Sequence, residues 1–183
     1  MAPPWARTVL ATERLSLRWL TPEDAAFMLR IWNDPAFLRY VGDRGLKTVE
    51  DARLALESGP LKLYREYGYG PYVLERAGDG PIGVCGLFRR EGLPDPDIGF
   101  ALLPEYCGKG YAREAADAVM RHAREDLGLD RLTAIVAAEN EPSVALIRRL
   151  GFSYEKMLRL PGDEREACLF GVDWQPGPTL PEG

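Results

Sequence analysis

The pattern of hydrophobic and polar positions predicts strands and helices that alternate along the chain. Residues 14–20 alternate apolar and polar side chains, which is typical of a half-buried strand. Residues 21–24 (Thr-Pro-Glu-Asp) combine a helix cap, a proline suited to the first turn and two acids that the helix dipole favours, and residues 48–51 repeat this start signal. The remaining strands are short segments separated by clusters of Gly, Pro and Asp. The predicted strands are residues 14–20, 72–76, 82–89, 97–103, 132–136, 154–160 and 166–173, and the predicted helices are residues 22–32, 49–58 with a further piece at 61–67, 110–126 and 141–150.

The order of these elements predicts one α+β domain. The run of strand, helix and strand from residue 97 to residue 136 implies a crossover between two parallel strands, whereas the other connections are typical of antiparallel pairing. We therefore expect a mixed, mostly antiparallel central sheet of about seven strands, flanked by about four helices. Residues 1–12 are predicted to be an N-terminal arm, residues 13–174 the domain, and the proline-rich residues 175–183 a flexible C-terminal tail.

Composition excludes several classes of protein. The chain has 183 residues, of which 46% are hydrophobic and 28% charged, as in a soluble globular domain. Its net charge of −5 argues against a nucleic-acid binder that neutralises phosphates. No apolar run approaches the roughly 20 residues of a membrane span, and no secretory signal opens the chain, so the expected location is the cytoplasm. One histidine and three widely spaced cysteines predict no metal site.

A glycine-rich turn stands between the strand at residues 97–103 and the longest helix. Gly108 and Gly110 allow a close backbone approach to a ligand, and the free N–H groups of the helix start would face an anion. Lys109 and Arg113 add positive charge, so the segment is a candidate phosphate cradle. It is not a mononucleotide P-loop, because Gly110-Tyr111 follows the lysine, and Arg113 stands where a dinucleotide fingerprint needs a small residue. An ordinary tight turn is the alternative interpretation.

A second cluster lies one strand further along the chain. It runs from Asn140 and Ser143 to Leu150-Gly151-Phe152. On its own it is a well-built helix, with Asn140 as the cap and Gly151 as the stop. The two clusters together, in this order, resemble the GNAT superfamily of N-acetyltransferases, and most closely its ribosomal-protein N-terminal acetyltransferase branch. The resemblance covers residues 13–174.

The resemblance implies where acetyl-CoA would bind. The sheet of this family opens as a V between its two parallel strands, and the pantetheine arm of the cofactor enters that gap. Here the arm would lie along Ala101, Leu102 and Leu103, with a backbone N–H near Leu102 facing the thioester carbonyl as an oxyanion donor. Asn140 would bind the cofactor amide or a water molecule. The residues expected at the diphosphate are Gly108, Lys109, Gly110, Tyr111, Ala112 and Arg113.

Two side chains are candidates for the chemistry. An amine nucleophile is mostly protonated at pH 7, so a general base is required. By resemblance this base is Asp97, which precedes Ile98-Gly99-Phe100, although an Asp that merely begins a strand is an equal alternative. Ser143 would assist the departing thiolate, because Ile147 stands where many family members have a tyrosine. The other candidates are Glu75, Asp95 and Glu91 for the base and Tyr154 for the thiolate.

The resemblance implies direct transfer of an acetyl group from acetyl-CoA to a primary amine in a ternary complex. The acceptor stays open: an N-terminal peptide amine, a polyamine, an amino acid or an aminoglycoside. Aromatic residues of the first helices, such as Trp32, are expected to line its site, whereas His122 is expected at the surface and Cys85 in the core. A cofactor-binding module without catalysis and a purely structural interaction domain are the alternatives. Exposed strand edges make a homodimer plausible.

Overall fold

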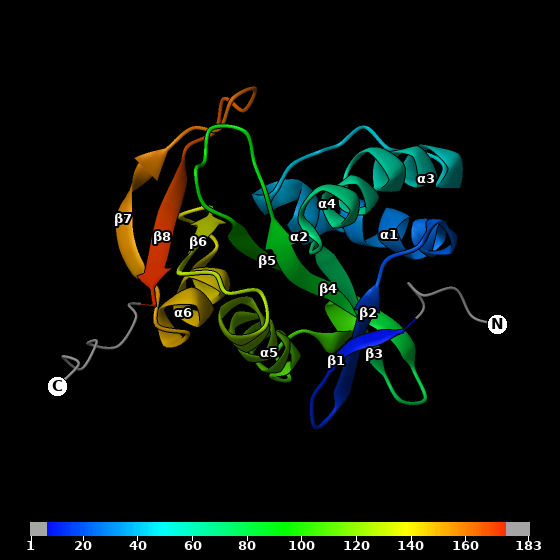
Figure 1. Cartoon of the computed structure of the whole chain (residues 1–183). Helices are drawn as coiled ribbons and strands as arrows, with labels where there is room; N and C mark the ends of the chain where they lie inside the picture. The colour runs from blue at the N-terminus through cyan, green and yellow to red at the C-terminus, as the bar shows by residue number, and fades with distance from the viewer. Residues whose placement is uncertain (1–6, 175–183) are drawn as a thin grey trace, which may run out of the picture.

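Eight strands form one sheet in the computed structural model, which describes residues 7–174 (Figure 1). The strands are β1 (Thr8–Ala11), β2 (Leu15–Trp19), β3 (Pro71–Arg76), β4 (Gly80–Phe88), β5 (Asp97–Leu102), β6 (Arg131–Val136), β7 (Ser153–Leu158) and β8 (Ala167–Asp173). Their order across the sheet is β1-β2-β3-β4-β5-β6-β8-β7. The pairing of β5 with β6 is parallel and the other pairings are antiparallel. The predicted mixed, mostly antiparallel sheet is confirmed, with one strand more than expected.

The additional strand is β1, within the segment that we interpreted as an arm. It pairs with β2, where Leu10 lies opposite Leu17, and the half-buried Val9 and Leu10 pack against the core. That interpretation therefore needs correcting for residues 8–11. Four residues are too few for their alternation to stand out in the sequence. Residues 1–6 and the predicted tail at 175–183 lie outside the described part of the chain.

Six α-helices accompany the sheet within residues 7–174. They are α1 (Ala25–Trp32), α2 (Pro35–Tyr40), α3 (Val49–Ser58), α4 (Pro60–Tyr67), α5 (Tyr111–Glu125) and α6 (Glu141–Arg149). The predicted start of α3 is confirmed, because Thr48 accepts a hydrogen bond from the Asp51 N–H while the Asp51 carboxylate accepts one from the Thr48 N–H. Helix α2 was not predicted, since it has only six residues and buries none of them.

The helices form two groups in space (Figure 1). Helices α1–α4 lie together at the upper right, and α1 and α4 both contact α3. Helix α5 packs on β4 and β5 through small side chains, including Ala115, Ala116 and Ala123, none of which is exposed. Their size lets the helix approach the sheet closely. No helix in residues 7–174 has both the length and the apolar character needed to cross a bilayer.

Strands β5 and β6 meet at one end and then separate. Their pairing is limited to Asp97 opposite Thr133. There the backbone N–H and the hydroxyl of Thr133 both donate to the carbonyl of Pro96, at 3.0 and 3.1 Å. Beyond this contact the two strands diverge, which is the V-shaped opening expected from the resemblance.

Candidate active site

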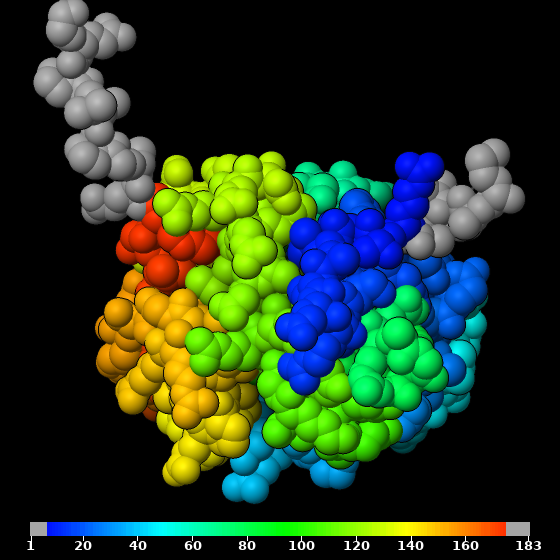
Figure 2. Space-filling view, turned by 90° about the horizontal axis from the view of Figure 1, so that it is seen from below, coloured from blue at the N-terminus to red at the C-terminus, as the bar shows by residue number. Residues whose placement is uncertain are grey.

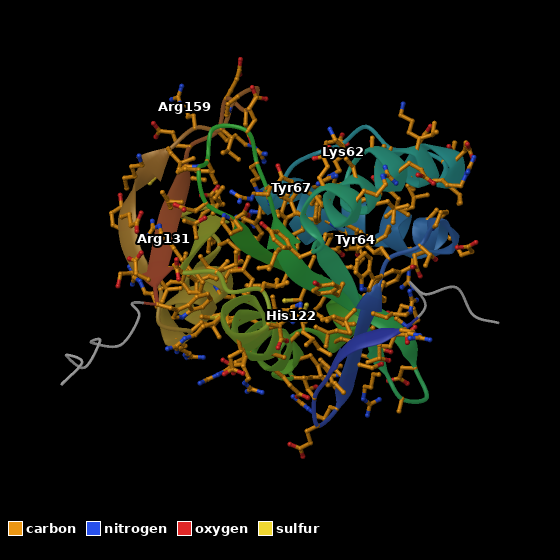
Figure 3. All side chains as sticks on the ribbon, viewed as in Figure 1. Lys62, Tyr64, Tyr67, His122, Arg131 and Arg159 are labelled. Carbon is orange, nitrogen blue, oxygen red and sulfur yellow. The ribbon has the colours of Figure 1, made fainter. Side chains whose placement is uncertain are left out.

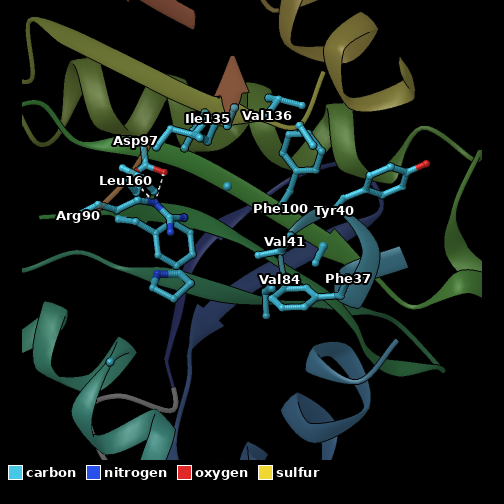
Figure 4. A pocket seen from close by; sticks show the side chains of 18 of the residues that line it. Phe37, Tyr40, Val41, Val84, Arg90, Asp97, Phe100, Ile135, Val136 and Leu160 are labelled. Atoms are coloured by element: carbon cyan, nitrogen blue, oxygen red, sulfur yellow. Dashed lines mark hydrogen bonds and ion pairs between the residues drawn. The ribbon is translucent and has the colours of Figure 1, made fainter. Parts of the chain in front are cut away.

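A cavity of about 710 Å³ lies where β5 and β6 separate. One wall consists of residues 97–101 of β5 and residues 135–137 at the end of β6. The opposite wall comes from α1, α2, α4 and the segment after α2. Figure 4 shows Phe37, Tyr40 and Val41 on one side of this space and Phe100, Ile135 and Val136 on the other. The cavity thus joins the opening between the strands to the helices α1, α2 and α4.

Asp97 lies at the inner end of this cavity, as the first residue of β5. Its residue surface is only 1% exposed, and its carboxylate pairs with the guanidinium of Arg90, with Nε–O distances of 2.9 and 3.1 Å (Figure 4). Burial raises the pKa of Asp97 to about 6, although the charge and hydrogen bond of Arg90 act in the opposite direction. A carboxylate of this kind is charged at neutral pH yet close enough to titration to accept a proton.

The other candidate carboxylates lie outside the cavity. Glu75 pairs with Arg18 at 2.8 Å, and Asp95 pairs with Arg131, the first residue of β6, at 3.0 Å. Glu91 is exposed in the turn before β5. Of the four carboxylates that the sequence offered, the structure brings Asp97 into the cavity.

Helix α6 carries the second group of predicted residues. Asn140, Ser143 and Ile147 are spaced three and four residues apart, so they share one face of the helix, and all three line the cavity. Asn140 occupies the N-cap position, but its side chain makes no capping hydrogen bond, so its amide is available to a ligand. Tyr154 does not reach the site: it is 52% exposed on β7 and contacts the ring edge of Phe170.

The backbone of β5 also presents a donor to the opening. The Leu103 N–H donates to the Ile82 carbonyl, on the β4 side, at 2.9 Å. Because successive N–H groups of a strand point in opposite directions, the Leu102 N–H faces the β6 side, where the sheet is open. Ala101 lines the cavity, Leu102 is half-buried and Leu103 is buried in the core.

The glycine turn has the geometry of an anion cradle. Gly108 and Gly110 have φ values of +73° and +84°, which side-chain-bearing residues rarely adopt. Gly110 is the N-cap of α5, and the first N–H bonded back into the helix is that of Glu114, which donates to the Gly110 carbonyl at 3.1 Å. The N–H groups of residues 111–113 therefore lack helical partners and face outward. The turn is exposed, so a phosphate has free access to it.

The glycine turn is hydrogen-bonded to the β1–β2 hairpin through residues that the sequence analysis did not identify. Arg14 donates to the Lys109 carbonyl at 3.0 Å, and its Nε pairs with Glu114 at 2.7 Å. The Arg14 guanidinium also lies 4.3 Å from the centre of the Tyr111 ring. Although burial opposes it, hydrogen bonds from Thr12 and Arg14 lower the pKa of Glu114. Figure 2 shows the blue hairpin beside the green start of α5. No local pattern links residues 100 positions apart.

Two other expectations have a clear outcome. His122 is not at the surface: its side chain is 11% exposed, with Nδ1 2.6 Å from Asp126 and Nε2 3.4 Å from the Tyr72 hydroxyl (Figure 3). The expectation was wrong because His122 follows the buried Val119 by three residues on the inward side of α5. Cys85 is fully buried, as expected. Within residues 7–174, no group of three or more His, Cys, Asp and Glu side chains could hold a metal ion.

Comparison with known proteins agrees with this geometry. The uncharacterized N-acetyltransferase p20 of Bacillus licheniformis is 32% identical over 154 residues, which cover 82% of this chain and 85% of that protein. Two solved structures share the fold: RimL, a ribosomal L7/L12 alpha-N-protein acetyltransferase, with coenzyme A (TM-score 0.76, 19% identity, 91% and 98% covered), and the spermidine N-acetyltransferase of Vibrio cholerae with CoA and spermine (0.73, 21%, 88% and 96%). The model of the acetyltransferase (GNAT) domain matches residues 14–153. The chain therefore belongs to the GNAT acetyltransferase family and is an N-acetyltransferase.

Proposed function

We propose that this enzyme moves the acetyl group of acetyl-CoA to a primary amine by direct attack in a ternary complex. The observation that carries the proposal is the cavity between the diverging strands β5 and β6, which Asp97, Asn140 and Ser143 all line. The cavity is open to the helices on one side and to the gap in the sheet on the other, so two substrates can meet in it.

Three parts of the chain would hold the cofactor. The N–H groups of residues 108–113, with Lys109 and Arg113, would bind the diphosphate. The pantetheine arm would lie along residues 101–103 in the gap, and the amide of Asn140 would bind a cofactor amide or a water molecule. Two structural neighbours of this fold contain CoA, which supports the assignment. Acetyl-CoA supplies the activated thioester.

The chain's own residues would then move the protons. Asp97 accepts a proton from the ammonium or from the attacking amine, directly or through water, and the amine nitrogen forms a bond to the thioester carbonyl carbon. The Leu102 N–H stabilises the negative charge that develops on the carbonyl oxygen. When the C–S bond breaks, the Ser143 hydroxyl donates a hydrogen bond to the departing thiolate, which is then protonated from water. The products are an acetamide and CoA, with no covalent enzyme intermediate.

Isothermal titration with acetyl-CoA tests the cofactor site. Gly110→Glu places a carboxylate and a strained backbone at the cradle, and we expect its affinity to fall at least about tenfold. Gly128→Glu is the matched control, because Gly128 has a similar φ of +66° and open space around it but lies beyond the far end of α5. Equal affinities of Gly110→Glu and the wild type would exclude the cradle.

An acceptor panel analysed by mass spectrometry tests the reaction itself. We expect an acetylated amine and one CoA per acetyl group transferred. Saturable cofactor binding without CoA release, whatever the amine, would instead indicate a binding module and refute the proposal.

A further inference from the structure

The cavity contains more positive charge than its own carboxylates balance. Four of its five acidic side chains form an ion pair within the described residues. The pairs are Asp97 with Arg90 (2.9 Å), Asp163 with Arg165 (2.9 Å), Glu66 with Lys62 (3.6 Å) and Glu166 with Arg159 (3.5 Å). The fifth, Glu139, is exposed at the rim and raises the pKa of Arg165 by its charge.

Three further arginines line the same cavity without a carboxylate partner within residues 7–174. The guanidinium of Arg44 lies over the rings of Trp32 and Phe37, at 5.0 and 5.8 Å from their centres. Arg39 lies over the ring of Tyr40. Arg89 donates to the Tyr69 hydroxyl and to the Pro94 carbonyl, and both of these partners are neutral. Although the chain has a net charge of −5, these unpaired arginines give the cavity a local excess of positive charge. Such an excess attracts an anionic group.

Of these three arginines, Arg44 is the best placed to bind a substrate. Arg90, the partner of Asp97, lines the same cavity, and its like charge acts on Arg44. Burial, and next the like charge of Arg90, lower its pKa, which shows that the guanidinium is not stabilised by a protein anion. It stays charged at neutral pH because arginine titrates far above that range.

The segment that carries Arg44 is held in place rather than loosely attached. At its start, Arg165 of the β7–β8 connection donates to the Val41 carbonyl across the mouth of the cavity. Within it, the Asp43 carboxylate accepts from the Gly45 N–H at 2.7 Å. At its end, the Asn33 amide donates to the Leu46 carbonyl at 3.0 Å. A guanidinium held at a fixed position on aromatic rings is pre-organised for the planar, two-point binding of a carboxylate.

We infer that the acceptor is a primary amine that also carries a carboxylate, which binds to Arg44 while the amine is directed toward Asp97. The inference rests on the proposed function and narrows its substrate class. A polyamine has no group for Arg44 and would bring further positive charge into a cavity in which four of the five carboxylates are already paired. A carboxylate instead balances the charge of Arg44 and can accept two hydrogen bonds from its guanidinium.

The test compares amines that differ only in this charge. The first pair is an α-amino acid and its amide, which differ in the α-carboxylate. The second pair is two C-terminally amidated peptides with Asp or Asn at the second position, which differ in a side-chain carboxylate. The two pairs thus distinguish the two sources of the carboxylate. Spermidine represents the polyamines. Values of kcat/KM are measured for the wild type, for Arg44→Met, which keeps an apolar stem on the rings, and for Arg65→Met as a control on α4 outside the cavity.

For at least one pair, we expect the wild type to prefer the carboxylate form by at least about tenfold, and Arg44→Met to reduce this preference to near unity. Arg65→Met should retain the preference, and the affinity of all three proteins for acetyl-CoA should be the same. A better rate with spermidine, equal rates within both pairs, or a preference that survives Arg44→Met would overturn the inference while leaving the acetyltransferase reaction intact. Failure of every amine to release CoA would overturn the proposed function as well.

Discussion

Replacing Asp97 by Asn tests both the chemistry and the electrostatics of the site. The change removes the proposed base while keeping the size of the side chain. Loss of a general base typically lowers turnover by about 10²–10⁴-fold. In the wild type, kcat/KM should rise with pH through an apparent pKa near 6, because Asp97 must be ionised to accept a proton. The pH profile of kcat/KM for Asp97→Asn should lack this inflection.

The same residue should change the pH dependence of stability. Burial raises the pKa of Asp97 from 3.8 to about 6, so the folded protein binds this proton more tightly than the unfolded chain. At 1.36 kcal/mol per pKa unit, the free energy of unfolding should fall by about 3 kcal/mol as the pH rises from about 4 to about 6, and should change little from this group above that range. In Asp97→Asn this contribution is absent. Denaturant titrations at each pH give the difference between the two proteins.

The control separates this effect from a general loss of structure. Arg90 loses its ion pair in Asp97→Asn, but because the asparagine side chain does not titrate, this loss adds no slope between pH 4 and 6. Glu75→Gln removes an ion-paired carboxylate on the neighbouring part of the sheet, outside the cavity, and should leave both profiles unchanged in shape. If Asp97→Asn retains wild-type turnover, Asp97 is not the base, and a parallel pH–stability curve would refute the electrostatic argument as well.

Three further variants probe other parts of the structure. Ser143→Ala should lower kcat by about tenfold or more while the acetyl-CoA affinity measured by calorimetry stays the same; an unchanged kcat would remove Ser143 from the mechanism. Arg14→Met should weaken acetyl-CoA binding about tenfold but leave turnover of acetyl-pantetheine, which lacks the diphosphate, unaffected, whereas equal losses with both would indicate a merely structural role. Tyr64→Phe should lower the free energy of unfolding by about 2 kcal/mol in denaturant titrations, because the buried Leu20 N–H and Pro71 carbonyl both lose their partner; no change would contradict this account.

Local pattern was sufficient to predict the part of the fold that forms the opening in the sheet. The strands at β5 and β6 and the helix α5 between them each have a clear period and clear end signals, so the crossover followed from their order. Asp97, Asn140 and Ser143 were predicted by resemblance, and they do line one cavity. Their roles stay predictions until the variants are measured.

Other features depend on contacts that no window of sequence contains. Strand β1 is defined by its partner β2 rather than by its own four residues. The bond between Arg14 and Glu114 spans 100 positions, and the inward position of His122 depends on which face of α5 meets the sheet. In each case a short or polar segment gains its role from a distant neighbour, and tertiary context decides its structure.

The binding sites of the cofactor and of the acceptor differ in how well the sequence predicts them, because only the acceptor site depends on contacts between distant residues. A diphosphate is bound by backbone N–H groups, which require glycine at fixed positions, so the cofactor side can be recognised from a motif. The acceptor side depends on which charges remain unpaired after folding. Arg89 and Arg90 are adjacent in the chain, yet Arg90 pairs with Asp97 and Arg89 bonds only to neutral groups. Only the folded structure distinguishes such neighbours, and it is this difference, together with Arg44, that points to a carboxylate on the acceptor.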